Sequence, residues 1–110
     1  MMLSTRTAEQ VASDAQAAHQ AAAVAAIHSR LEAHARAMGY SSALSLATYT
    51  TSPRPDWRAE AEAFVAWRDA VWTEAHALLS KAQATGRIPS IEDVLAALPA
   101  WPDAHKEVDR

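Results

Sequence analysis

The sequence contains no cysteine and only two glycines among its 110 residues. Without cysteine the chain has no disulfide framework and no thiolate ligand for zinc, which is typical of proteins in a reducing compartment. Because glycine is rare and alanine is the commonest residue, the composition favours helix before any pattern is considered. No segment shows the strict apolar–polar alternation of a half-buried strand, so we predict an all-α fold.

Long hydrophobic runs and blocks of like charge are also missing. The longest weakly polar run, residues 21–27, is far too short to cross a membrane. The first ten residues, MMLSTRTAEQ, lack the apolar block of a signal peptide. The net charge is −3 with acidic and basic residues interspersed, so there is no basic stripe to follow a phosphate backbone. We therefore expect a protein that binds neither membranes nor nucleic acids.

The densest apolar pattern lies between residues 56 and 79, which hold three of the four tryptophans and the only phenylalanine. At about 100° per residue, most of its large apolar residues fall within one broad arc, which is typical of a helix with a single buried face. We predict that this helix is capped by Ser52 or Asp56, runs to about Ala84, and is ended by Gly86.

A second long helix is predicted from residue 8 to residue 38. Thr7 and Gln10 resemble a capping box at its start, and Gly39 is placed to end it. Its second half carries an apolar stripe at 3–4 spacing, whereas residues 8–23 carry almost only alanine. This alanine-rich half can pack against another helix only through its small side chains, or it stays exposed to solvent. The pattern leaves open whether the helix is continuous or breaks near residues 22–23.

The remaining segments predict two short helices and a turn. Ser41 or Ser42 can cap a helix that reaches about residue 49, residues 48–55 read as a turn, and Ser90 can cap a helix over 91–98. The predicted fold is a small antiparallel helical hairpin or bundle with these two short helices packed on it.

This reading divides the chain into three parts. Residues 1–23 form an alanine-rich N-terminal helical extension, residues 24–101 a helical domain, and residues 102–110 a flexible charged tail. The extension is predicted to act as an oligomerisation or partner-binding stem, because an alanine-rich helix without a packed face is marginal in water.

Groups that carry out catalysis or bind metals do not converge anywhere in the sequence. His28 and Glu32 share a helical face at i, i+4 spacing, but a metal site needs three or four ligands. The acidic residues of the main helix point in several directions and read as a solvated face: Glu60, Glu62, Asp69 and Glu74. We therefore expect no catalytic residue, no metal, no cofactor and no enzymatic activity.

Arg68 is unusual because it falls near the middle of the apolar arc. We interpret it as a structural anchor with a buried stem, whose guanidinium reaches the backbone carbonyls of residues 39–49 or pairs with Glu60. A binding anchor is the alternative. The structural reading predicts that Arg68→Ala lowers thermal stability more than a change at an exposed arginine does.

Three apolar residues are candidates for contact with a partner. Trp67 lies on the rim of the apolar arc, and Trp101 follows the end of the last helix. Tryptophans in such positions either cover a small core or belong to an interface, and the core looks too small to hold all four. Val11 is the only large apolar residue of the alanine-rich extension and would mark its contact face.

The order of motifs in the second half is distinctive. AEAEAFVAWRDAVW is followed by the turn GRIPS and by IEDVLAALPAW. This arrangement, over about residues 27–101, resembles small proteins and C-terminal modules encoded among the tail and tail-fibre genes of tailed bacteriophages and prophages. The resemblance implies a virion tail component or a tail-fibre assembly factor, and it brings no catalytic residues.

Three functional hypotheses follow. The first is a non-enzymatic phage tail component that binds a tail or tail-fibre subunit, located in the virion tail or in the host cytoplasm during assembly, with its N-terminal helix bound to copies of itself or to the partner. The second is a tail-fibre assembly chaperone that is absent from the virion. The third is a small acidic regulator or inhibitor of a host protein.

Overall fold

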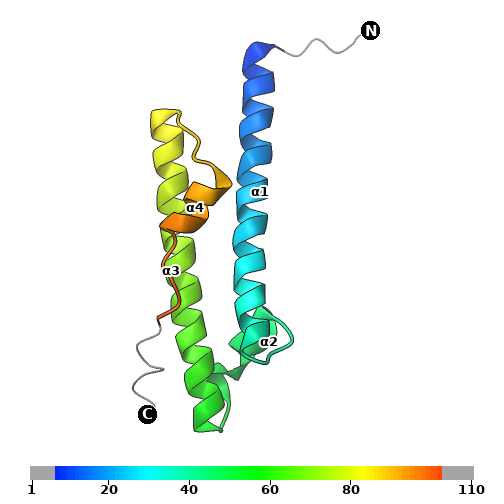
Figure 1. The fold of residues 1–110 in the computed structure, drawn as a ribbon, viewed down its shortest axis with the longest axis vertical. Coiled ribbons are helices and arrows are strands. Elements are labelled where there is room, and N and C mark those ends of the chain that lie inside the picture. The colour runs from blue at the N-terminus through cyan, green and yellow to red at the C-terminus, as the bar shows by residue number, and fades with distance from the viewer. Residues whose placement is uncertain (1–6, 103–110) are drawn as a thin grey trace.

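A computed structural model describes residues 7–102, and every regular element within this range is helical. The elements are α1 (Ala8–Ala37), α2 (Ala43–Ala47), the 3₁₀ helix η1 (Thr48–Thr51), α3 (Pro55–Thr85) and α4 (Ile91–Ala97). α1 and α3 run antiparallel as a long hairpin, with α2 and η1 at the turn and α4 lying across the pair (Figure 1). The predicted all-α class and the helical hairpin are therefore confirmed.

The described range ends before most of the predicted charged tail, of which only Pro102 is included, and begins after the first six residues of the predicted extension. Over residues 7–102, no helix combines the length and the hydrophobicity that crossing a bilayer requires.

The ends of α1 follow the signals in its sequence. The Thr7 hydroxyl accepts a hydrogen bond from the Gln10 amide, and the Gln10 side chain accepts one from the Thr7 amide, both at 3.0 Å. At the other end Gly39 has a φ of 101°, and the Tyr40 amide donates to the Ala35 carbonyl at 3.1 Å. A left-handed residue of this kind closes a helix at little steric cost when it is glycine. Between these ends α1 is continuous, so the break considered near residues 22–23 is absent.

α3 begins differently from the prediction. Neither Ser52 nor Asp56 caps it. The N-cap is Arg54, without a side-chain cap, and Pro55 takes the first turn. Proline suits this position because its missing N–H would have no partner inside the helix. Residues 48–55, which were predicted as a turn, contain the 3₁₀ helix η1. At its other end α3 is ended by Gly86, with a φ of 75°, as predicted.

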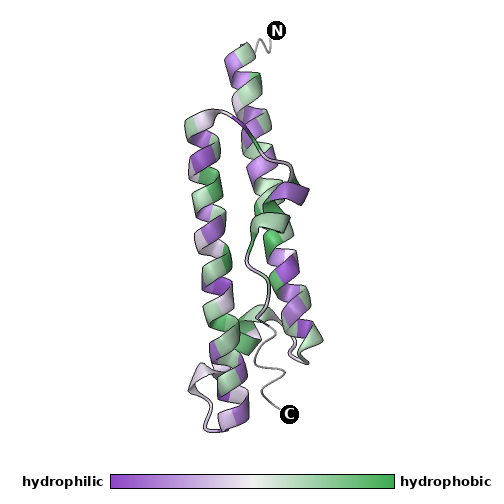
Figure 2. Cartoon of the chain, turned by 60° about the vertical axis from the view of Figure 1, so that its left-hand side comes forward, coloured by the Kyte–Doolittle hydropathy of each residue, from purple (hydrophilic) through white to green (hydrophobic). Residues whose placement is uncertain are grey.

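The core forms where α2 and α4 pack against the long pair. Its buried residues come from all four α-helices and the residue after α4: Ile27, Leu31, Ala35, Leu46, Ala61, Phe64, Trp67, Val71, Val94 and Leu98. α1 continues past the end of α3 in both views, with hydrophilic and hydrophobic residues alternating along the projecting part (Figures 1 and 2). Residues 7–15 are all exposed. The N-terminal turns of α1 therefore lie outside the core.

Candidate functional site

The short helices cover the α1–α3 pair unevenly. On the side of α4, the Arg30 guanidinium donates to the Leu95 carbonyl at 2.9 Å. On the side of α2, the Ala43 amide donates to the Glu32 carboxylate at 3.0 Å, near the C-terminal end of α1. α2 is only five residues long, so it covers one end of that side and stops there. Towards the N-terminal half of α1, a groove remains between α1 and α3.

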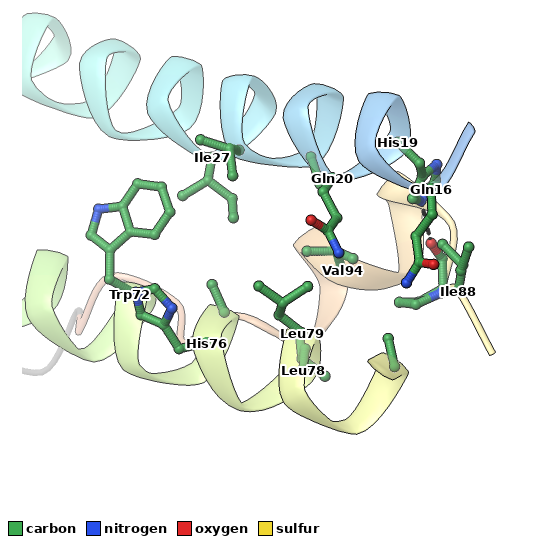
Figure 3. A pocket seen from close by; sticks show the side chains of 15 residues that line it. Gln16, His19, Gln20, Ile27, Trp72, His76, Leu78, Leu79, Ile88 and Val94 are labelled. Carbon is green, nitrogen blue, oxygen red and sulfur yellow. Dashed lines mark hydrogen bonds between the residues drawn. The ribbon is translucent and has the colours of Figure 1, made fainter. Parts of the chain in front are cut away.

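This groove has a volume of about 100 Å³ and is lined by side chains of α1, α3, α4 and the segment that leads into α4. Figure 3 shows Ile27 and Gln20 reaching in from α1, Trp72 and Leu79 from α3, and α4 behind them. Its lining contains no acidic residue, lysine or arginine: Gln16, His19, Gln20, Ala23, Val24, Ile27, Trp72, Ala75, His76, Leu78, Leu79, Ala82, Ile88, Pro89 and Val94. The walls are therefore apolar, and the few polar groups are amides and imidazoles.

Small and polar side chains continue beyond the groove along both helices. Helical spacing of three and four residues places Gln10, Ser13, Ala17, Gln20, Val24 and His28 on one side of α1. The same spacing places Trp72, His76, Leu79 and Gln83 on one side of α3. Asp14 has the same spacing, four residues after Gln10 and three before Ala17, so this side of α1 also carries an acidic residue near its N-terminal end.

Two histidines of α1 make contacts at or beside the groove. The His19 Nε2 atom lies 2.6 Å from the Pro89 carbonyl oxygen, which ties α1 to the segment before α4. The His28 ring lies 4.9 Å from the ring of Trp72, at an interplanar angle of 56°. Because Glu32 accepts the Ala43 amide instead, His28 and Glu32 serve different contacts. Within residues 7–102 no group of three or more potential ligands is arranged to hold a metal ion.

Trp67 is not on the rim of the core as predicted. It is 6% exposed, and its indole N–H donates to the Pro99 carbonyl at 2.9 Å. The physical reason is that the chain after α4 returns across this face of α3 and covers the ring. A helical wheel of α3 alone does not contain that information. In this state Trp67 is not accessible to a partner.

Trp101 is half-buried on top of Trp67. The two rings meet edge to face at 5.4 Å, and the ring of His34 lies 4.3 Å from that of Trp101. Trp101 therefore covers part of the core, and its predicted contact with a partner stays a prediction. Val11 is 52% exposed on the projecting part of α1, and its predicted role likewise stays a prediction.

Arg68 is not the predicted anchor. Its guanidinium pairs with the neighbouring Asp69 carboxylate at 3.0 Å and does not reach residues 39–49 or Glu60. The side chain is more than a third exposed, because its position lies at the boundary of the buried face. Other arginines connect elements: Arg30 joins α1 to α4, and Arg58 donates to the Ser52 carbonyl at 2.9 Å.

These contacts change the expected effect of Arg68→Ala on stability, which should now be smaller than that of Arg30→Ala. Arg68→Ala removes a solvent-exposed ion pair and should change the free energy of unfolding by less than about 0.5 kcal/mol. Arg30→Ala removes a charged donor to a backbone carbonyl of α4 and should cost about 1 kcal/mol. Urea denaturation of both variants measures the difference, and an Arg68→Ala loss that exceeds that of Arg30→Ala would contradict it.

A polar contact fixes the turn end of the hairpin. The Tyr40 hydroxyl donates to the Glu60 carboxylate at 2.6 Å, and the Tyr40 and Tyr49 rings meet edge to face at 5.3 Å. Partial burial, followed by the hydrogen bond to Glu60 and its negative charge, raises the pKa of Tyr40 to about 12. This contact links α3 to the loop that follows α1.

The raised pKa predicts a stability change at alkaline pH. Tyr40 releases its proton near pH 10 in the unfolded chain and near pH 12 in the folded protein, so its contribution is complete below pH 10 and is lost as pH rises to 12. Tyr40→Phe should therefore show a smaller fall in melting temperature over this range. In a Tyr49→Phe background, ultraviolet titration follows Tyr40 alone, and Glu60→Gln should lower its pKa. An unchanged pKa in Glu60→Gln would contradict the assignment.

Spacing predicts only part of the groove lining on a buried side, namely Val24, Ile27, Trp72, Ala75, Leu78 and Leu79; Gln16, His19 and Gln20 belong to the half of α1 predicted to lack a packed face. One feature of the sequence could have indicated a groove: the two long helices carry more apolar positions than the two short helices can cover.

No family model matches the sequence, and neither a curated protein nor a solved structure matches it.

Proposed function

We propose that this chain is a non-enzymatic protein-interaction module whose docking site is the groove between α1 and α3. The observation that carries the proposal is that the groove is apolar, uncharged and left open by the short helices. An apolar groove between two helices is the type of surface that the apolar side of another helix fills. Val24, on its rim, is 43% exposed and would be covered by such a helix.

The particular setting that we propose is the tail of a bacteriophage, with a tail or tail-fibre subunit as the partner. This part rests on the resemblance of the WRDAVW helix, the GRIPS turn and the following LPAW segment to phage tail modules. A module that contributes contacts and no chemistry agrees with a structural or assembly role. Whether the protein stays in the particle separates a tail component from an assembly chaperone.

The test is co-expression of the full chain with the tail and fibre subunits encoded beside it, followed by affinity purification. We expect one of these subunits to be retained by the wild type and by Leu44→Lys, and lost with Val24→Lys. Leu44 and Val24 are both exposed apolar residues, but only Val24 borders the groove. Retention of a host enzyme and of no phage subunit would overturn the phage setting in favour of an inhibitor.

Mass spectrometry of purified particles completes the test. The protein is expected among the virion proteins if it is a tail component. Its absence from particles whose fibres depend on it for assembly would identify a chaperone instead, while leaving the docking role of the groove intact.

A further inference from the structure

We infer that a second pocket, at the turn end of the hairpin, binds the guanidinium group of an arginine side chain on a partner protein. The pocket has a volume of about 480 Å³ and is formed by the end of α1 and the loop after it, α2, η1 and the first turns of α3. It lies at the end of the molecule that carries α2 (Figure 1). It shares no lining residue with the groove, so the inference goes beyond the proposed function and does not depend on it.

Three aromatic rings form a continuous wall of this pocket. The Tyr49 ring meets the Tyr40 ring at 5.3 Å and the Trp57 ring at 5.7 Å, both edge to face. The rings come from the loop after α1, from η1 and from α3, so three separate elements hold the wall together. Trp57 stays 39% exposed although it is a large apolar residue. The faces of aromatic rings attract cations, and tryptophan attracts them most strongly.

The charge of the pocket also favours a cation. Asp56 and Glu60 line it, and among the described residues no lysine, arginine or histidine does. Asp56 is already paired with Arg54, which lies outside the lining. Glu60 accepts the Tyr40 hydroxyl through Oε1, and no residue in the described range pairs with its charge. Beyond partial burial, the hydrogen bond to Glu60 and the nearby negative charges raise the pKa of Tyr40 to about 12, and the same negative potential attracts a cation.

The neighbouring Arg54 shows which cation suits this combination of groups. Its guanidinium carbon lies 4.0 Å from the centre of the Trp57 ring, while its Nε and Nη2 atoms donate to the two Asp56 oxygens at 3.3 and 2.9 Å. A planar guanidinium can stack on a ring and donate two hydrogen bonds to a carboxylate at once, which an ammonium group does not do. On the pocket side, Tyr49 and Glu60 offer a ring and a carboxylate of the same kind.

The open shape of the pocket favours a side chain that a partner protein presents over a free small molecule. Asp56, Trp57 and Glu60 are all exposed, so a small molecule bound here would stay largely in water. Sites for small molecules bury about 70–90% of their ligand. An arginine side chain is instead covered by the protein that carries it, and arginine is enriched at protein interfaces for this reason.

An NMR titration of the full, ¹⁵N-labelled chain tests the inference. The probe is a blocked tripeptide with a central arginine between two alanines. We expect weak, saturable binding that shifts the Trp57 indole N–H and the backbone amides of residues 38–60. The same peptide with citrulline, which has the shape of arginine without its charge, should cause no such shifts.

Glu60→Gln should weaken binding of the arginine peptide roughly fivefold, the factor expected when one solvent-accessible ion pair is lost. Glutamine can still accept the Tyr40 hydroxyl, so the walls of the pocket should stay in place. Glu62→Gln is the matched control because it removes the same charge from an exposed position of α3 outside the pocket, and its affinity should equal that of the wild type. Circular dichroism shows that both variants fold.

Four outcomes would overturn the inference. They are an absence of shifts in the pocket, equal binding of the citrulline peptide, equal weakening in Glu60→Gln and Glu62→Gln, and tighter binding of ethylguanidinium than of the peptide. The last would mean that the pocket takes a small molecule. Val24→Lys should leave this titration unchanged, because Val24 lines only the groove. Failure of subunit retention through the groove and failure of peptide binding at Glu60 are therefore separate results.

Discussion

Replacing Phe64 with alanine is expected to lower the free energy of unfolding by about 4 kcal/mol. Its side chain is fully buried in the core, and truncation of a buried phenylalanine costs both transfer free energy and the cavity left behind. Its ring is close to that of Trp67, 5.9 Å between centroids, so the loss also loosens the aromatic cluster. A domain of this size has a total stability of roughly 5–15 kcal/mol, so the variant should lose a large share of it and melt well over ~10 °C below the wild type.

Urea denaturation and thermal melting measure this effect. Phe64→Leu, which conserves more of the volume, should cost less than about 1.5 kcal/mol. Leu44→Ala is the exposed control, because Leu44 is 76% exposed on α2, and it should stay within about 0.5 kcal/mol of the wild type. A melting temperature for Phe64→Ala within a few degrees of the wild type would show that the ring is not at the centre of the core.

Trp67→Phe is expected to have the second largest effect, about 2–3 kcal/mol. The change removes part of a buried ring and the indole N–H that donates to the Pro99 carbonyl, which then loses this partner. The segment after α4 should also detach from α3, since this hydrogen bond and the ring of Trp101 hold it there.

Unfolding by urea and near-ultraviolet circular dichroism test this prediction. Trp101→Phe is the appropriate control because Trp101 is only half-buried, and we expect it to cost about 1 kcal/mol or less. A loss for Trp101→Phe as large as that for Trp67→Phe would mean that the outer ring, and not the buried hydrogen bond, holds the segment in place.

Local signals in the sequence were sufficient for most of the helix ends. Gly39 and Gly86 end α1 and α3 with positive φ, and Ser42 and Ser90 cap α2 and α4 as predicted. These predictions succeeded because caps depend on a few neighbouring residues. The start of α3 was missed because Pro55 at the first turn makes a side-chain cap dispensable.

The roles of individual side chains on α3 depend on packing that its own sequence does not contain. Trp67 and Arg68 are adjacent, and the helical wheel placed Arg68 further inside the apolar arc than Trp67. In the structure Trp67 is buried under Pro99, and Arg68 pairs with Asp69 at the surface. The return path of the chain after Leu98 decides this, and helical periodicity cannot reveal such a path. The groove was hidden for the same reason, since Val24 and Leu79 have the spacing of core residues, and helical periodicity does not show that no element packs over them.

The attachment of α4 has a consequence for the order in which the molecule is completed during synthesis. Arg30 contacts Leu95 of α4 and His19 contacts Pro89 just before it, so these contacts to α1 join residues 65 and 70 positions apart. The chain is synthesised from its N-terminus, so the α1–α3 hairpin is translated in full before its last helix exists. A nascent chain that ends before Ile91 has no Val94 behind the groove and no Pro99 above Trp67. The final fifth of the chain therefore completes the packing around Trp67 and behind the groove, and premature termination there leaves part of the apolar side of α1 and α3 uncovered.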